Sequence, residues 1–458
     1  MINRQSHQQC IEPECLARYA LDERIYACSR CGGLLDIETK PTAEVESLKK
    51  LWRERRSSFE PRDLSGVWRF RELLPFTDDA PVVSLGEGNT PLYDAPGSAR
   101  YCKLNSLKLK HQGANPTGSF KDAGMTTAVT QARLLGTRLV GCASTGNTAA
   151  SLAAYAARAD MLCAIIVPEG QVSHAKLAQA LDYGAVVLEI EGNFDDAMRV
   201  IRELAEQGNI YLVNSINPFR IEGQKTVMIE LAEQLGWEMP DHLVVPGGNL
   251  GNSSAFGKGL QELLQLGLLD RLPQITVVQA EGAAPFADLF QKHRNELRDG
   301  EIPSEIKNVA RPKTLASAIK IGAPVSWKKA WRTLSWTQGR VLTVNEQEIA
   351  DAKAIIGRDG IGCEPASATT VAGIKKLVAA EIIREDQRVV AVLTGHLLKD
   401  SEYVINYHRG KLTVTTEAVE PQPITATFGN RPVSVKADAV QIREQFQRLL
   451  DLKVGGPT

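Results

Sequence analysis

The sequence predicts an α/β protein with two open, twisted, mostly parallel sheets, an active site between them and a zinc-ribbon-like segment at the N-terminus. Two observations support the α/β class and the separate N-terminal segment. From about residue 138, short apolar stretches alternate with amphipathic stretches of helical periodicity, the pattern of parallel strands covered by helices on both faces. In addition, cysteines crowd the first segment of the chain, which indicates a small separate unit.

Composition narrows the range of functions. The 458 residues favour two or three domains, and 43% hydrophobic with 23% charged residues is ordinary for a globular chain. The net charge of −1 gives no reason to expect nucleic acid or a membrane surface as a partner. The first residues lack the apolar core of a secretory signal, and no apolar run is long enough to span a bilayer. We therefore expect a cytoplasmic protein.

Four cysteines in the first segment form two short pairs, Cys10 with Cys15 and Cys28 with Cys31. In a reducing compartment a disulfide framework is not expected, and two such pairs about a dozen residues apart suit tetrahedral Zn²⁺. Four thiolates would leave no open coordination position, so the zinc would be structural. The alternatives are a ribbon without metal or four merely structural thiols.

The chain is expected to divide into four parts. We expect a zinc-ribbon-like segment at 1–50, a large domain from 51–135 and 221–420, a small domain at 136–220, and a C-terminal extension at 421–458. Strands are expected at 101–105, 139–143, 162–167, 185–190, 211–213, 243–245, 275–278 and 388–393. Helices are expected at 44–60, 120–129, 148–159, 174–183, 194–207, 222–235, 346–358, 366–380 and 438–451, with alternating, β-like sequence between residue 400 and the last helix.

The turn at residues 115–122, Asn-Pro-Thr-Gly-Ser-Phe-Lys-Asp, precedes one of these helices. Ser119 is a good N-cap, which would place Lys121 in the first turn, where the helix dipole disfavours an ammonium. A lysine with a lowered pKa suits attack on a carbonyl, because only the free amine is nucleophilic. Judged alone, Lys121 is more simply an exposed surface lysine.

Three loops follow predicted strands, at the edge where ligands of parallel sheets bind. Residues 144–148, Ser-Thr-Gly-Asn-Thr, offer hydroxyls and amides that suit a carboxylate, although simple N-capping would explain them as well. Residues 247–253, Gly-Gly-Asn-Leu-Gly-Asn-Ser, let the backbone approach a phosphate closely, with a plain tight turn as the alternative. Thr394 closes the last strand and could contact a ring nitrogen or merely end the strand. His396 beside it is better explained as structural.

Together, an early-turn lysine, a carboxylate loop, a phosphate loop and a strand-end hydroxyl describe a pyridoxal phosphate site. The stretch around Lys121 also resembles the cofactor-lysine motif of the threonine synthase family, within the tryptophan-synthase-β class. Residues 84–92, 214–218, 318–322 and 393–396 are similar to further segments of that family. The resemblance covers about residues 80 to 400, and the N-terminal cysteines resemble a ribbon that some members carry.

The resemblance implies a set of site residues. Lys121 would be the Schiff-base lysine and proton shuttle, Asn147 would contact the ring hydroxyl, and Thr394 the pyridine nitrogen. The cofactor phosphate would be held by Gly247, Gly248, Asn249, Leu250 and Gly251. Ser144, Thr145 and Thr148 would face the substrate, with Lys176 and Arg220 as candidates for its phosphate. Gln171 departs from the basic residue common in relatives, which puts this second phosphate site in question.

The resemblance further implies the conversion of O-phospho-L-homoserine and water to L-threonine and phosphate, by a homodimer. Two alternatives remain open at this point. One is a related β-replacement enzyme or dehydratase on the same fold, such as a cysteine or cysteate synthase or a threonine dehydratase. The other is a non-catalytic regulator that binds pyridoxal phosphate or zinc.

Overall fold

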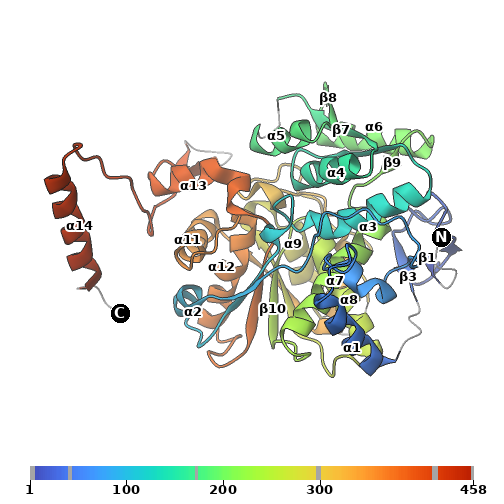
Figure 1. Cartoon of the computed structure of the whole chain (residues 1–458), viewed down its shortest axis with the longest axis horizontal. Coiled ribbons are helices and arrows are strands. Elements are labelled where there is room, and N and C mark those ends of the chain that lie inside the picture. The colour runs from blue at the N-terminus through green and yellow to red at the C-terminus, as the bar shows by residue number, and fades with distance from the viewer. Residues whose placement is uncertain (1–5, 40–43, 171–173, 296–300, 415–420, 455–458) are drawn as a thin grey trace.

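A six-stranded sheet forms the centre of the molecule (Figure 1). The computed structural model describes residues 6–39, 44–170, 174–295, 301–414 and 421–454. The strand order is β12-β11-β10-β13-β5-β4, parallel throughout except for the antiparallel edge strand β4. The strands are β4 (Leu92–Asp94), β5 (Lys108–His111), β10 (His242–Pro246), β11 (Gln274–Ala280), β12 (Arg340–Val344) and β13 (Val389–Leu393).

Helices cover both faces of this sheet. Leu243 and Val245 of β10 belong to a core shared with one group of helices, whereas Val244 between them belongs to the core on the other face. One group is α3 (Lys121–Leu134), α7 (Pro218–Gln234), α8 (Gly251–Gln265) and α10 (Trp327–Thr337); the other is α2 (Pro96–Cys102), α11 (Glu346–Arg358) and α12 (Pro365–Ala379). In Figure 1, α3, α7 and α8 lie on one side of β10, and α2, α11 and α12 lie on the other.

A second, fully parallel sheet has the order β8-β7-β6-β9 and lies at the top of Figure 1. Its strands are β6 (Leu139–Ala143), β7 (Leu162–Pro168), β8 (Val186–Ile190) and β9 (Tyr211–Leu212), and its helices are α4 (Asn147–Arg158), α5 (His174–Asp182) and α6 (Phe194–Glu206). Ile201 of α6 packs with Ile166, while Leu152 of α4 packs in the core that contains Cys142. The predicted α/β class with two mostly parallel sheets is confirmed.

Asparagine caps explain where several helices begin. Asn193 and Asn345 each form a capping box, with Asp196 at the start of α6 and Glu348 at the start of α11. Asn217 caps α7 by accepting a hydrogen bond from the amide of Phe219 at 3.0 Å, and Pro218 occupies the first helical position. This helix therefore begins four residues earlier than the expected 222.

The N-terminal segment folds as a small antiparallel sheet, β2-β1-β3, of β1 (His7–Cys10), β2 (Arg18–Tyr19) and β3 (Leu35–Glu38). Ion pairs and a hydrogen bond attach this sheet to helices α8 and α10. The Asp36 carboxylate lies 2.8 Å from the Lys329 ammonium of α10 and also pairs with Arg332. Lys258 of α8 donates to the carbonyl oxygen of Ile37. Helix α1 (Val45–Arg56) follows this sheet.

Two sequence-based expectations are wrong. Residues 101–105 do not form a strand, because Pro96 starts helix α2, Lys103 ends it in a left-handed conformation at φ 59°, and the strand comes later, as β5. The β-like region after Asp400 begins instead with α13 (Ser401–His408), and among its described residues the strands are β14 (Thr413–Val414) and β15 (Gln422–Pro423). The terminal helix α14 (Ala439–Val454) lies apart from both sheets in Figure 1.

The remaining elements are short or were not expected from the sequence. Strand β12 and helices α9 (Pro285–His293) and α10 were not expected. The 3₁₀ turns are η1 (Trp68–Leu73), η2 (Gln112–Ala114), η3 (Glu281–Ala283), η5 (Ser317–Ile319) and η6 (Leu397–Asp400). Within the described ranges, no helix combines the length and the apolar character needed to cross a membrane.

Candidate active site

The site is built where strand ends and helix starts meet. Beyond the end of β13, the Thr394 carbonyl accepts a hydrogen bond from the amide of Phe120 at 2.8 Å, and Gly395 forms a β-bridge with Ser119. These bonds hold Lys121 beside the carboxyl end of the central strand. The loop after β6 is brought to the same place through Asn147. Three predicted residues, Lys121, Asn147 and Thr394, are thus gathered around one position.

Lys121 is the first residue of α3, and its side chain is largely enclosed. Its pKa is lowered to about 7, chiefly by burial and further by the positive charge of Arg220, against the opposing charge of Glu364. The sequence analysis attributed the shift to the helix dipole, whereas burial is the larger cause. Phe120, not Ser119, occupies the N-cap, and the Ser119 hydroxyl only accepts a 3.4 Å bond from the Lys121 amide.

Asp122 stabilises the turn that presents Lys121. Its carboxylate accepts from the amide and hydroxyl of Thr117 at 2.7 and 2.6 Å, and from the Ser151 hydroxyl of α4 at 2.6 Å. Burial raises the pKa of Asp122 to about 6. Gly118, at φ +81°, supplies the left-handed residue that the turn requires. The turn is therefore fixed to the helices of both sheets.

Glu364 was missed by sequence reasoning and lies at the centre of the site. Its carboxylate accepts from the Asn147 side-chain amide at 3.0 Å and from the Thr394 hydroxyl at 2.9 Å. Gly395 makes room for it, since a Cβ there would lie 2.4 Å from the Glu364 carboxyl carbon. In the sequence, a glutamate before Pro365 is typical of an ordinary helix start. Its place in the site is evident only from its hydrogen bonds to residues of distant segments.

The glycine loop after β10 has the properties of an anion site. The Gly247 amide donates a hydrogen bond to the Val278 carbonyl at 2.7 Å. A Cβ at Gly247 would lie 2.6 Å from the Val277 side chain, so a larger residue does not fit. Leu250 adopts a left-handed conformation at φ 64°, after which α8 starts at Gly251. Among the described residues, the amides of Gly248, Leu250 and Gly251 have no hydrogen-bond acceptor. These free donors at a helix N-terminus suit a phosphate.

Asn249 differs from its neighbours because its side chain forms hydrogen bonds within the protein. The amide nitrogen donates to the Ser215 hydroxyl at 2.7 Å, and the amide oxygen accepts from the Val325 amide at 2.6 Å. Asn249 therefore joins the loop to two other segments. The next helical residues, Asn252 and Ser253, are buried, and their side chains lack hydrogen-bond partners within the described chain.

The loop after β6 is partly open. Asn214 fixes its start by bonding both the amide and the carbonyl of Ala143, at 3.0 and 2.9 Å. Ser144, Thr145 and Thr148 remain partly exposed, whereas Asn147 between them is buried. The side-chain oxygen of Asn147 has no partner among the described residues, although it is buried. An unpaired buried acceptor is costly unless a ligand supplies the missing hydrogen bond.

Arg220 lies near Lys121 at the start of α7 and is 2% exposed. One of its nitrogens donates to the Val213 carbonyl at 3.3 Å, and no carboxylate in the described chain pairs with it. Burial lowers the pKa of Arg220 to about 10. The guanidinium therefore keeps donors available for an anion. The Lys176 side chain and Gln171 lie outside the described residues.

The four N-terminal cysteines converge. The sulfur atoms of Cys10, Cys15, Cys28 and Cys31 all lie within 4.8 Å of one another, at 3.4 Å between Cys10 and Cys31 and 3.6 Å between Cys15 and Cys28. Tetrahedral zinc with bonds of about 2.3 Å needs sulfur separations of about 3.8 Å. The donor set and its spacing therefore fit a zinc ion.

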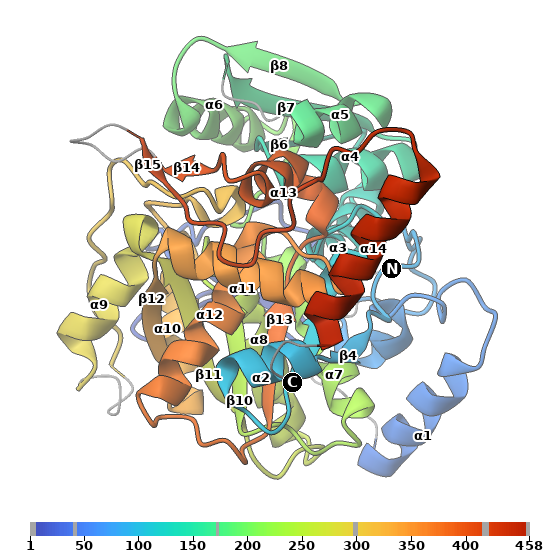
Figure 2. The same ribbon diagram turned by 90° about the vertical axis from the view of Figure 1, so that its left-hand side faces the viewer.

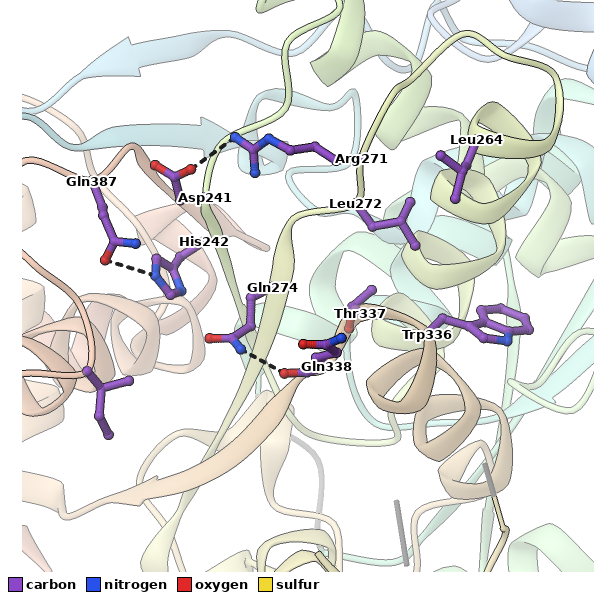
Figure 3. A pocket seen from close by; sticks show the side chains of 11 residues that line it. Asp241, His242, Leu264, Arg271, Leu272, Gln274, Trp336, Thr337, Gln338 and Gln387 are labelled. Atoms are coloured by element: carbon purple, nitrogen blue, oxygen red, sulfur yellow. Dashed lines mark hydrogen bonds and ion pairs between the residues drawn. The ribbon is translucent and has the colours of Figure 1, made fainter. Parts of the chain in front are cut away.

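A cavity of about 640 Å³ lies elsewhere, near the amino ends of β10 and β11 (Figure 3). Its polar groups largely satisfy one another: Asp241 pairs with Arg271 at 2.9 Å, and Gln274 donates to the Gln338 carbonyl at 2.7 Å. Because ligands of such sheets bind at the carboxyl ends of the strands, this cavity is not the active site.

Solved structures share this fold. Diaminopropionate ammonia lyase from Escherichia coli has a TM-score of 0.59 at 16% identity, covering 83% of this chain and 94% of its own. Threonine deaminase isoform 2 from Solanum lycopersicum has a TM-score of 0.58 at 19% identity, covering 80% of this chain and 90% of its own. At such identities the likeness is one of fold.

Sequence relatives are more specific. The family model "Pyridoxal-phosphate dependent enzyme" matches residues 83–395. Threonine synthase from Methanocaldococcus jannaschii is 46% identical over 404 residues, which is 87% of this chain and 94% of that protein. Threonine synthase from Mycobacterium tuberculosis is 42% identical over 362 residues, which is 79% of this chain and 94% of that protein. The chain therefore belongs to the threonine synthase family of pyridoxal-phosphate-dependent enzymes.

Proposed function

We propose that the protein converts O-phospho-L-homoserine and water to L-threonine and phosphate. The observation that carries this proposal is Arg220, a buried guanidinium beside Lys121 without a carboxylate partner in the described chain. It would supply a third anion site, in addition to the glycine loop for the cofactor phosphate and the loop after β6 for the substrate carboxylate. A substrate that carries its own phosphate needs this third site, whereas serine or threonine as substrate does not. Relatives that bear the name threonine synthase support the same reaction.

Pyridoxal phosphate fits the residues present. Gly247, Gly248, Asn249, Leu250 and Gly251 would hold its phosphate, with the loop's free amides as donors. Asn147 would meet its ring hydroxyl and Thr394 its ring nitrogen. The unpaired, buried side-chain oxygen of Asn147 supports this fit. When bound, the cofactor supplies an electron sink that stabilises negative charge on the substrate carbons.

Lys121 would attach the cofactor and then act as an acid and base. With a pKa of about 7, its amine is free in a large fraction of molecules at neutral pH, so it can both take and return a proton. In this proposal it moves protons among the α, β and γ carbons while phosphate leaves Cγ and water adds at Cβ. Arg220, with Lys176, would hold the departing phosphate, since arginine suits bidentate phosphate binding.

The partly exposed loop after β6 would orient the substrate. Ser144, Thr145 and Thr148 present hydroxyls near the helix start of α4, a location that favours a carboxylate. We further propose that zinc occupies the four-cysteine cluster in a structural role, that the protein is a homodimer by analogy with its class, and that it works in the cytoplasm.

The decisive experiment incubates the purified holoenzyme with O-phospho-L-homoserine and measures threonine and phosphate. Both products should form in equal amounts, and the cofactor absorbance should change when substrate is added. Absence of both products contradicts the proposal. Parallel assays with O-phosphoserine plus sulfide or sulfite, and with free threonine, test the β-replacement and dehydratase alternatives. A cofactor band that responds to none of these substrates would favour a non-catalytic regulator.

A further inference from the structure

A second pocket, of about 550 Å³, lies between α11, α13 and the C-terminal extension. The extension builds its outer wall, because residues 425–430 are bonded to both helices. Thr425 and Gln347 of α11 exchange two hydrogen bonds of 2.8 Å, and the amide of Asn430 donates to the His408 ring at 3.0 Å. A volume of this size is typical of small-molecule sites. In Figures 1 and 2, α13 lies next to α11 at the base of the extension.

Three basic side chains line this pocket, Lys353, Arg358 and His408, while its lining contains no Asp or Glu. Arg358 is held in place by a 3.2 Å bond to the Phe428 carbonyl and by contact with the Phe428 ring. Within the described chain, no carboxylate lies within ion-pair distance of Lys353, whose ammonium lies 5.9 Å from the centre of the Tyr403 ring. Lys353 and His408 are half-buried and Arg358 is exposed, so the pocket carries positive charge that favours an anion.

The titration behaviour agrees with this geometry. Burial lowers the pKa of Lys353, although Cys363 and Asp400 oppose the shift. Burial also lowers the pKa of His408, with the charges of Lys353 and Arg358 contributing, so the His408 ring lies near both cations. The Tyr403 hydroxyl is buried and has no hydrogen-bond partner in the described residues. The apolar part of the lining includes Ala354, Leu397 and Val404.

We propose that this pocket binds a small organic acid, whose carboxylate pairs with Lys353 and Arg358 while its carbon chain contacts the apolar wall. The pocket is lined by residues that adjoin active-site residues in the sequence. Gly362 and Cys363 line it and directly precede Glu364, and Leu397 follows His396, which forms a β-bridge with Cys363. A ligand here would therefore contact the rear of the two segments that carry Glu364 and Thr394. Binding itself does not depend on the reaction proposed above.

The test titrates the holoenzyme with succinate by isothermal calorimetry at constant ionic strength. Succinate should bind, and Lys353→Met should weaken its affinity at least about tenfold, as expected for losing a charged hydrogen-bond partner. Lys411→Met is the matched control, because Lys411 lies in the same region but does not line the pocket. Its affinity should equal that of the wild type. Succinamide, of similar size but uncharged, should not bind.

Three outcomes overturn the proposal: no heat of binding up to about 20 mM succinate, equal affinity of wild type and Lys353→Met, or equal binding of succinamide. If Lys353→Met does not fold, judged by circular dichroism, Arg358→Gln and Lys353→Arg replace it. Arg358→Gln should weaken succinate binding, whereas Lys353→Arg should retain it. A protein without threonine synthase activity that still binds succinate in this way would refute only the proposed reaction.

Discussion

The side-chain amide of Asn147 donates to the carboxylate of Glu364 over 3.0 Å, although 217 residues separate them. This bond joins the first helix of the four-stranded sheet to the N-cap of α12 on the six-stranded sheet. The same carboxylate accepts from Thr394 at 2.9 Å. Glu364 thus ties together the two side chains that we propose contact the cofactor ring, and its charge acts on Lys121.

The first prediction concerns pH. Lys121 has its pKa lowered to about 7, so its amine is mostly protonated below pH 7 and mostly free above it. The rate at which the apoprotein captures pyridoxal phosphate, followed by absorbance, should therefore rise with pH and level off, with a midpoint near 7. A small primary amine such as butylamine, measured alongside, corrects for titration of the cofactor. A midpoint near 10 would contradict the assignment.

The neighbours of Lys121 should move this midpoint in opposite directions. The negative charge of Glu364 raises the Lys121 pKa, so Glu364→Gln should shift the midpoint down. The positive charge of Arg220 lowers that pKa, so Arg220→Met should shift the midpoint up. The same capture assay measures both. Shifts of the same sign in the two variants would refute this account.

Replacement of the lysine itself gives a third prediction. Lys121→Ala should lose covalent attachment, so that borohydride treatment no longer fixes the cofactor to the chain, as mass spectrometry would show. Turnover should fall by at least about 10²–10⁴-fold, the usual contribution of a general acid and base. Noncovalent binding should persist, because the glycine loop is unchanged. Residual covalent cofactor in Lys121→Ala would disprove the role.

Arg220 allows a test of the substrate phosphate site. Arg220→Met should raise KM for O-phospho-L-homoserine by about 10–100-fold, corresponding to roughly 1.5–3 kcal/mol for a charged hydrogen bond. Arg220→Lys should recover part of that loss, since it restores the charge but not the planar fork. Inhibition by inorganic phosphate should weaken in parallel. An unchanged KM together with unchanged phosphate inhibition would place the substrate phosphate elsewhere.

Metal removal should loosen the N-terminal sheet. If zinc occupies the cysteine cluster, a chelator or Cys28→Ser should release it, detected by atomic absorption, and lower the melting temperature.

Asp36→Asn should cost about 3–5 kcal/mol in unfolding free energy while retaining zinc, because it leaves Lys329 buried without its partner. Glu12→Gln is the control, since its pair with Lys328 is more exposed and should cost under about 1 kcal/mol.

The sequence predicts most of the parallel framework and the loops at its edge. Ser144, Gly247 and Thr394 each follow an apolar strand, so chain order alone placed them at helix starts or strand ends. The cause of the Lys121 pKa was not predictable, because burial depends on how α3 packs. Glu364 and the Asp36–Lys329 pair join segments hundreds of residues apart, and their local sequence is that of ordinary helix starts and strands. Helix α13 was missed because its short sequence lacks a clear helical period.

The order of strands in the larger sheet has a consequence for synthesis of the chain. Strand β13 lies between β10 and β5, yet it is the last of the six strands to be made. The four-stranded sheet, by contrast, uses one continuous stretch from β6 to β9. On the ribosome the smaller sheet can pair early, and β5 can pair with β4. The other edge of β5 must wait for β13, about 280 residues downstream, a long-range pairing that slows folding. Until then the backbone edge of β5 that later pairs with β13 has no partner, and an unpaired strand edge is exposed to chaperones and to aggregation.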